Sequence, residues 1–63
     1  SSAEILHFSQ LSHEVNYQII IRYRDDITTA MRIKHKGVVY NIKSIINVQG
    51  RDKYLKILAQ ARE

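Results

Sequence analysis

A set of basic residues in this chain has a spacing that could support binding of an anionic partner. Arg32, Lys34 and Lys36 occupy alternate positions, so in an extended strand all three project on the same side. Small β-barrels bind nucleic acid by combining such charges with exposed aromatic rings that stack on bases. The tyrosines fall mostly at positions that we expect to be buried, so we favour a charged strand edge or a protein contact over nucleic-acid binding.

The histidines and serines do not form a catalytic or metal-binding set. His7, His13 and His35 lack an i, i+4 pairing, and the chain has no cysteine to complete a tetrahedral metal site. Ser12 and His13 are neighbours that point to opposite faces of a strand, which does not suit nucleophilic catalysis. A glycine-rich phosphate loop is also missing. We therefore expect no enzyme activity, cofactor, metal or small-molecule substrate.

Two adjacent carboxylates, Asp25 and Asp26, could suggest a metal site or an acid–base pair. Catalytic carboxylates converge on one substrate, whereas neighbours in a turn usually diverge. Aspartates in turns bond nearby backbone amides, and Thr28 and Thr29 can do so more weakly. We interpret this segment as a turn between two strands.

The strongest structural pattern precedes that turn. From Val15 to Tyr23 every second residue is apolar or aromatic and most residues between them are polar. A period of two predicts a strand with one buried face. Ile20 interrupts the polar set, so we expect the second face to be partly covered as well.

A tight hairpin and a bulge are predicted after the turn. Gly37 separates the alternating run of residues 31–36 from a second run that begins at Val38, which is typical of a hairpin. The alternation then changes phase, and a bulge near Lys43 and Ser44 would restore the register and help the sheet to curl into a barrel.

The N-terminal segment shows a helical spacing. Ser1 and Glu4 have the spacing of a capping box, and Ile5, Phe8 and Leu11 fall three apart on one helical face. These residues predict a short N-terminal helix.

The last segment, residues 53–63, is ambiguous. As a strand it places Leu55, Ile57, Ala59 and Ala61 on one face, whereas its residue types favour a helix slightly. Short apolar runs of this kind are not resolved by periodicity alone.

Composition indicates one small domain that depends on partners. The 63 residues include no cysteine, and the longest apolar run is three residues, so we expect no disulfide, membrane span or signal peptide. A domain this small is marginally stable without a staple, which favours association with other subunits. Residues 1–30 carry two basic and four acidic groups and residues 31–63 carry eight and two, so the net charge of +4 is uneven. Such asymmetry suggests polar subunit faces or an anionic partner.

A series of short motifs from Ser12 to Ala59 resembles the head-tail joining, or head-closure, proteins of long-tailed bacteriophages and prophages. Residues 3–11 fit the short helix that commonly precedes these motifs in the family. The motifs, in chain order, are Ser12-His13, Arg22-Tyr23-Arg24, Ile27, Met31-Arg32-Ile33, Gly37, Tyr40-Asn41-Ile42 and Arg51.

The resemblance implies a mainly β fold, a small, partial antiparallel β-barrel of about four strands with a short N-terminal helix, and makes the last segment a strand. Family members are typically longer, with a further N-terminal strand. We therefore expect residues 1–63 to be a single domain, either the C-terminal part of a longer protein, which we favour, or a reduced relative of the family. In both cases a sheet edge is free to accept a strand from a neighbour.

The resemblance also implies a function without catalytic residues. Such proteins form a ring, by family resemblance a dodecamer, that closes the DNA-filled capsid below the portal and provides the surface on which the tail docks. The implied partners are portal or adaptor proteins above, tail-completion proteins below and genomic DNA in the lumen, with no membrane. The implied location is the head-tail interface of the virion, and the host cytoplasm during assembly.

The alternative function is a small β-barrel nucleic-acid-binding protein. We predict one set of residues for the protein interface and another for the core. The candidate protein-interface residues are Arg22, Arg24, Arg32, Lys34, Lys36 and Arg51. The predicted core residues are Val15, Tyr17, Ile19, Ile21, Ile33, Tyr40, Ile42, Leu55 and Ile57.

Overall fold

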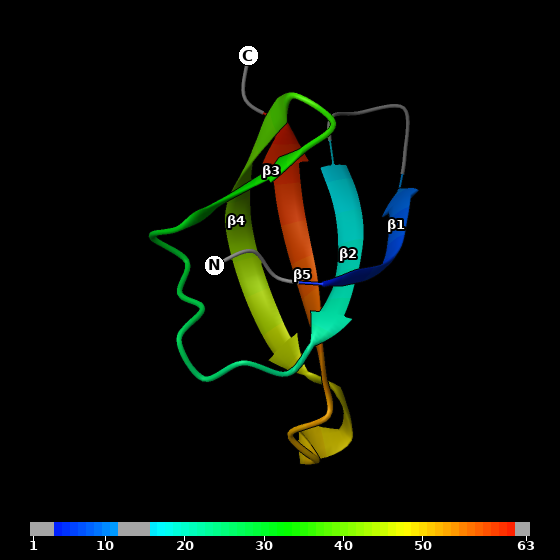
Figure 1. The fold of residues 1–63 in the computed structure, drawn as a ribbon, viewed down its shortest axis with the longest axis vertical. Helices are drawn as coiled ribbons and strands as arrows, with labels where there is room; N and C mark the ends of the chain where they lie inside the picture. The colour runs from blue at the N-terminus through cyan, green and yellow to red at the C-terminus, as the bar shows by residue number, and fades with distance from the viewer. Residues whose placement is uncertain (1–3, 12–15, 62–63) are drawn as a thin grey trace.

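The computed structural model describes residues 4–11 and 16–61, which form one antiparallel five-stranded sheet in the order β1-β2-β5-β4-β3. The sheet is strongly curled into a half-barrel (Figure 1). Its elements are β1 (Ile5–Gln10), β2 (Asn16–Arg22), β3 (Arg32–His35), β4 (Val38–Asn47), the single 3₁₀ turn η1 (Val48–Gly50) and β5 (Tyr54–Ala61). The mainly β class is confirmed, with five strands rather than about four.

The prediction of an N-terminal helix is wrong, because Ile5–Gln10 is strand β1, paired with β2. The register of this pair shifts between Ile5 and His7, so two residues of β1 lie opposite Ile20. A bulge of this kind returns Ile5 and Phe8 to the same face although they are three residues apart. The spacing that suggested a helix is therefore produced by a bulged strand. Ser1, the predicted helix cap, lies outside the described residues.

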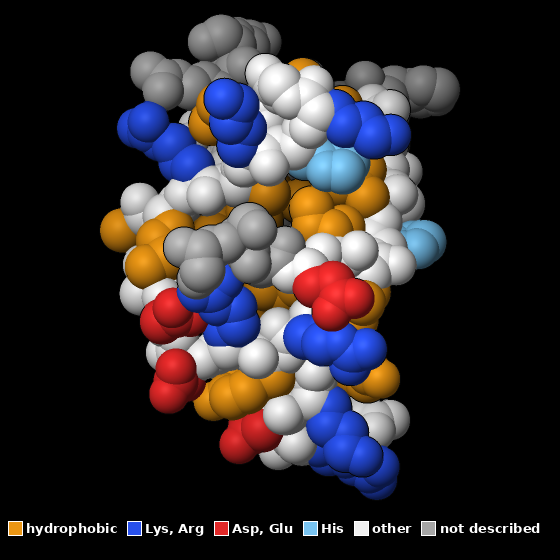
Figure 2. Space-filling view, viewed as in Figure 1, with side chains coloured by type: hydrophobic (Ala, Val, Ile, Leu, Met, Phe, Trp, Pro, Cys, Tyr) orange, Lys and Arg blue, Asp and Glu red, His pale blue; other side chains and the backbone are white. Residues whose placement is uncertain are grey.

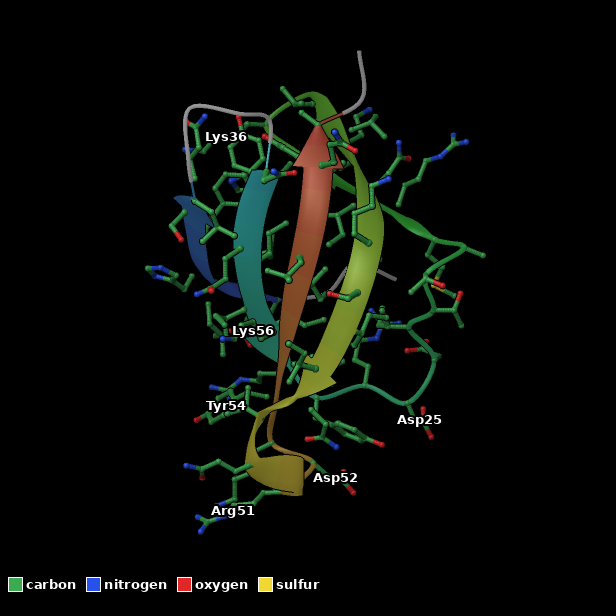
Figure 3. The ribbon with its side chains drawn as sticks, turned by 180° about the vertical axis from the view of Figure 1, so that it is seen from behind. Asp25, Lys36, Arg51, Asp52, Tyr54 and Lys56 are labelled. Atoms are coloured by element: carbon green, nitrogen blue, oxygen red, sulfur yellow. The ribbon has the colours of Figure 1, made fainter. Side chains whose placement is uncertain are left out.

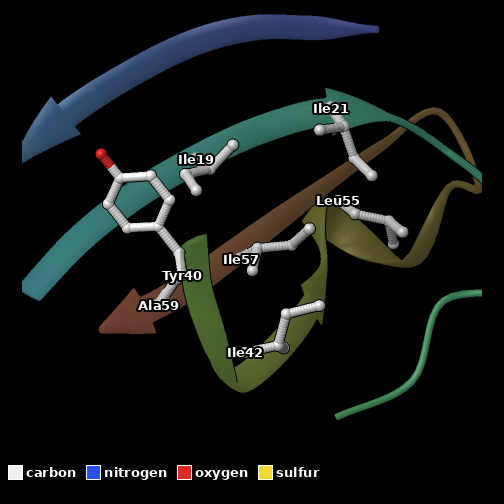
Figure 4. Packing of buried hydrophobic residues seen from close by; sticks show 7 residues of the cluster. All are labelled: Ile19, Ile21, Tyr40, Ile42, Leu55, Ile57 and Ala59. Carbon is white, nitrogen blue, oxygen red and sulfur yellow. The ribbon is translucent and has the colours of Figure 1, made fainter. Parts of the chain in front are cut away.

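The core lies on the inner face of the three central strands (Figure 4). Six predicted core residues are buried there, as is Ala59, which was not predicted. Tyr17 and Ile33 are half-buried and pack against this cluster, and Val15 lies outside the described residues. The buried cluster consists of Ile19, Ile21, Tyr40, Ile42, Leu55, Ile57 and Ala59.

The predicted bulge in β4 is confirmed. Ile42 is paired with Ala59 and Ser44 with Leu58, so Lys43 is an extra residue on β4. The extra residue reverses the facing of everything that follows on this strand. Ile46 therefore lies on the outer face, 45% exposed.

The hairpin between β3 and β4 is also confirmed. Lys36 and Gly37 form a two-residue turn, and both have positive φ angles, 51° and 83°. This backbone is that of a type I′ turn, whose twist matches the twist of the flanking strands. Glycine adopts such a conformation without the cost that a side chain imposes.

The final segment is a strand, as the family resemblance implied. β5 lies in the middle of the sheet, between β2 and β4, and is hydrogen-bonded to both. A slight helical propensity amounts to tenths of a kcal/mol per residue. Pairing on both sides and burial of Leu55, Ile57 and Ala59 outweigh it.

An aromatic cluster brings the two edges of the sheet together at one end. Phe8 on β1 lies 4.6 Å from His35 on β3, measured between ring centroids. Phe8 also contacts Tyr17 and Tyr40, each at 5.3 Å, and those two rings are 5.0 Å apart. Such ring pairs contribute about 0.5–1.5 kcal/mol beyond area burial. Side-chain contact between the edge strands therefore stabilises the curl.

We predict that Ile57→Ala destabilises the fold by about 2–5 kcal/mol, because this fully buried side chain leaves a cavity at the centre of the sheet. Urea unfolding followed by circular dichroism measures the change. Ile46→Ala, on the exposed outer face, is the matched control and should cost only about 0.5 kcal/mol. Equal losses in the two variants would contradict the assignment of inner and outer faces.

We also predict that Tyr40→Phe reduces the alkaline loss of stability. Burial raises the pKa of Tyr40 above its ordinary value of 10.0, and the neighbouring Tyr17 adds to the effect. Above pH 10.0 the unfolded chain ionises at this position while the folded chain stays neutral. The contribution of Tyr40 to the free energy of unfolding is therefore fully present below this pH. It is lost as the pH rises towards the pKa of Tyr40 in the folded chain. Unfolding midpoints at neutral and alkaline pH measure the difference, with the exposed Tyr54→Phe as control.

Candidate protein interface

The structure separates the six predicted interface residues instead of gathering them into one patch. Figure 2 shows Lys and Arg side chains in several groups on one face, with apolar side chains between them. Lys36 and Arg51 lie at opposite ends of the molecule (Figure 3). Arg22 ends β2, Arg24 follows it in the loop, Arg32 and Lys34 belong to β3, Lys36 is in the hairpin turn and Arg51 follows η1.

Arg22 and Arg24 are engaged in ion pairs within the chain. Arg22 donates from Nε to Glu4 Oε1 at 3.0 Å, and this pair is largely exposed. Arg24 donates from Nε and Nη2 to the two carboxylate oxygens of Asp26, at 2.9 and 2.7 Å. The hydrogen bond from Arg24 lowers the pKa of Asp26, and the same bond raises the pKa of Arg24. Two of the six guanidinium and ammonium groups are thus already paired with carboxylates of the same chain.

The loop between β2 and β3 is a turn-rich segment, as predicted. The Thr28 hydroxyl oxygen accepts a hydrogen bond from the Ala30 amide at 3.3 Å, and the Thr28 carbonyl accepts one from the Met31 amide at 3.1 Å. The bidentate bond between Arg24 and Asp26 fixes the start of the loop. The loop therefore has defined internal bonds that hold Ile27 and Met31 beside β3.

Arg32 and Lys34 lie on a free edge of the sheet. β3 pairs only with β4 over the described ranges, and the side chains of both residues are exposed. In a two-residue hairpin the residues flanking the turn form a hydrogen-bonded pair, and the pairs then alternate along the ladder. The register of His35 with Val38 therefore directs the backbone groups of Arg32 and Lys34 away from β4. This edge offers both backbone hydrogen bonds and positive charge.

A cavity of about 370 Å³ opens beside this edge. Buried core residues form its floor, and the loop between β2 and β3 supplies further apolar walls. Three of the predicted interface residues, Arg24, Arg32 and Lys34, line it together with Asp26. Its apolar lining residues are Ile21, Ile27, Met31, Ile33, Ile42 and Ile57.

The sequence did not reveal this cavity, because its walls come from a loop and from strands that are distant in the chain. The alternation of Met31 and Ile33 with basic residues was the only signal, and it was compatible with an ordinary buried face. An apolar hollow with basic residues beside it and a free strand edge suits an extended protein segment carrying apolar and acidic side chains.

Two further observations concern other kinds of site. In the parts of the chain that the structure describes, no three His, Asp or Glu side chains gather where they could hold a metal ion. Residues 4–11 and 16–61 also include no helix with the length and apolar character needed to cross a membrane.

The comparisons with known proteins give one clear result. The model of the phage head completion protein family matches residues 1–62, which is nearly the whole chain. No curated protein and no solved structure matches it. The match agrees with the resemblance carried by the motifs between Ser12 and Ala59. The chain belongs to the phage head completion protein family.

Proposed function

We propose that this chain is a non-enzymatic ring subunit of the head-tail connector in a phage or prophage. Family membership indicates a structural role in the phage head, in contact with other structural proteins of the virion. The proposed subunit closes the DNA-filled capsid below the portal and provides a docking surface for the tail. It assembles in the host cytoplasm and stays at the head-tail interface of the virion.

The observation that best supports this proposal is the basic free edge of β3 beside an apolar cavity. Arg32 and Lys34 carry charge that no described side chain neutralises. Charged groups beside an apolar surface select partners by complementary potential and contribute most to specificity and association rate. A portal-side or tail-side protein could add an acidic, extended segment to β3. That segment would use the free backbone edge, the basic side chains and the apolar cavity.

A ring also fits the physical limits of the domain. A sheet in one layer with two edges buries little surface, so association with other subunits stabilises it by mass action. Contacts between two different surfaces of identical subunits generate closed rings when the rotation closes. We propose a dodecamer on the basis of the family resemblance, with portal or adaptor proteins above, tail-completion proteins below and genomic DNA in the lumen.

The alternative function, a small nucleic-acid-binding barrel, is favoured by one local feature. Tyr54 is 40% exposed and lies opposite Arg22 across the β2–β5 pair, with Lys56 on the same face of β5. An exposed ring near cations can stack on bases. Binding of this kind weakens steeply with salt, so oligonucleotide affinity over a series of salt concentrations distinguishes the two functions.

We predict that the double variant R32E/K34E impairs assembly more than folding. Both side chains are exposed, so circular dichroism and the unfolding midpoint should stay close to those of the wild type. In a phage that lacks the wild-type gene, the variant should give filled heads without tails, because repulsion replaces attraction at the β3 edge. Particle titres and electron micrographs measure the defect.

The matched control is K43E/K53E, which reverses the same number of positive charges at exposed positions away from the β3 edge. Normal particles with this control would show that net charge alone does not cause the defect. Normal tail attachment with R32E/K34E would contradict the proposed role of the β3 edge.

A further inference from the structure

The outer face of the central strands carries an apolar surface with Lys56 at its centre and the ion pair of Arg22 with Glu4 at its border. Lys56 on β5 lies directly between Ile20 on β2 and Ile46 on β4, and Tyr54 and Leu58 are its neighbours on the same face of β5. We call these five residues the outer-face patch. Ile46 and Tyr54 are 45% and 40% exposed, and the other three are half-buried. The interruption of the polar pattern at Ile20 is part of this surface.

Lys56 determines what could cover the outer-face patch. Its ammonium group has no ion pair or hydrogen bond with any described residue. Covering the surrounding isoleucines with a purely apolar partner would desolvate this charge without compensation, which is costly. A suitable partner therefore presents a carboxylate surrounded by apolar groups.

The chain itself carries such a surface on the loop between β2 and β3. Asp25 is exposed and its charge attracts Arg24, but unlike Asp26 it makes no hydrogen bond or salt bridge among the described residues. Met31 of the same loop is 43% exposed and supplies apolar area. Asp25 lies on the opposite side of the molecule from Tyr54 and Lys56 (Figure 3), so one copy cannot satisfy its own lysine.

We propose that the outer-face patch binds the β2–β3 loop of a second copy, with the Asp25 carboxylate on the Lys56 ammonium group. The inference rests on the proposed ring and names its copy-to-copy contact. Each copy uses the patch for one neighbour and the loop for the other, so the contact is heterologous and can close into a ring. The backbone edge of β3 stays available for proteins of a different kind.

Charge reversal tests the contact in particles made with the full-length protein. K56E and D25K should each lower the titre of infectious particles at least about tenfold, since each places like charges in every copy-to-copy contact. The double variant D25K/K56E restores opposite charges and should recover most of the titre. Unfolding midpoints verify that all three variants fold.

Several outcomes would overturn the inference. Normal titres for both single variants would do so, as would a double variant that is as defective as either single. A loss of salt-sensitive oligonucleotide binding in K56E, with no recovery in the double variant, would assign the patch to nucleic acid instead. The wild-type chain could restore the titre of a phage that lacks its own copy of the gene, while K56E and D25K give wild-type titres. In that case the proposed function stands and only this contact is refuted. Absence of the wild-type chain from particles refutes both.

Disulfide trapping gives a second test that does not depend on charge reversal. Residues 1–63 contain no cysteine, so within this part of the protein a disulfide in D25C/K56C joins introduced residues. Oxidised particles should yield a ladder of multimers larger than dimers, because each copy carries one cysteine for each neighbour. The matched control is D25C/K36C, since Lys36 is also an exposed cation but lies at the hairpin tip. Equal ladders in the two pairs would contradict the proposed contact.

Discussion

Burial of the inner face by curling is the constraint on which this structure depends. The residues that the structure describes form no second layer over the sheet, so the apolar residues of β2, β4 and β5 cover one another. Ile57 lies at the centre of this arrangement, fully buried. Two bulges, one in β1 and one in β4, allow the strands to bend, and the contact of Phe8 with His35 brings the edge strands together at one end. Burial of the central apolar side chains and bending of the strands thus depend on each other.

The same constraint explains why so much edge and apolar surface stays accessible. A curled sheet of this size buries its inner face and leaves the backbone edge of β3, the cavity beside it and the outer face of β5 accessible. These features would be costly in a protein that works alone, because unpaired edges and apolar patches promote unwanted association. We propose that in this head completion protein they provide surfaces for the other structural proteins of the virion.

Much of the fold follows from local patterns in the sequence. Alternation in β2, the glycine at the hairpin and the phase change in β4 each have a direct physical cause, and the structure shows all three. The prediction for the N-terminal segment was wrong because a bulged strand and a helix both place residues three apart on the same face. The β5 segment was ambiguous because its central place in the sheet, not its residue types, makes it a strand.

The candidate site was less predictable than the fold. Alternation correctly placed Arg32 and Lys34 side by side, but it carried no information on pairing within loops. The ion pair of Arg24 with Asp26 and the cavity walls arise from tertiary packing. Surfaces of this kind need the path of the loop between β2 and β3, which residue patterns do not specify.

The most direct test of the central claim is high-resolution electron microscopy of the neck of intact particles. We expect a closed ring of curled five-stranded sheets between portal and tail, in which adjacent copies touch through different surfaces. A neck without this chain, or one in which its copies do not touch, would contradict it.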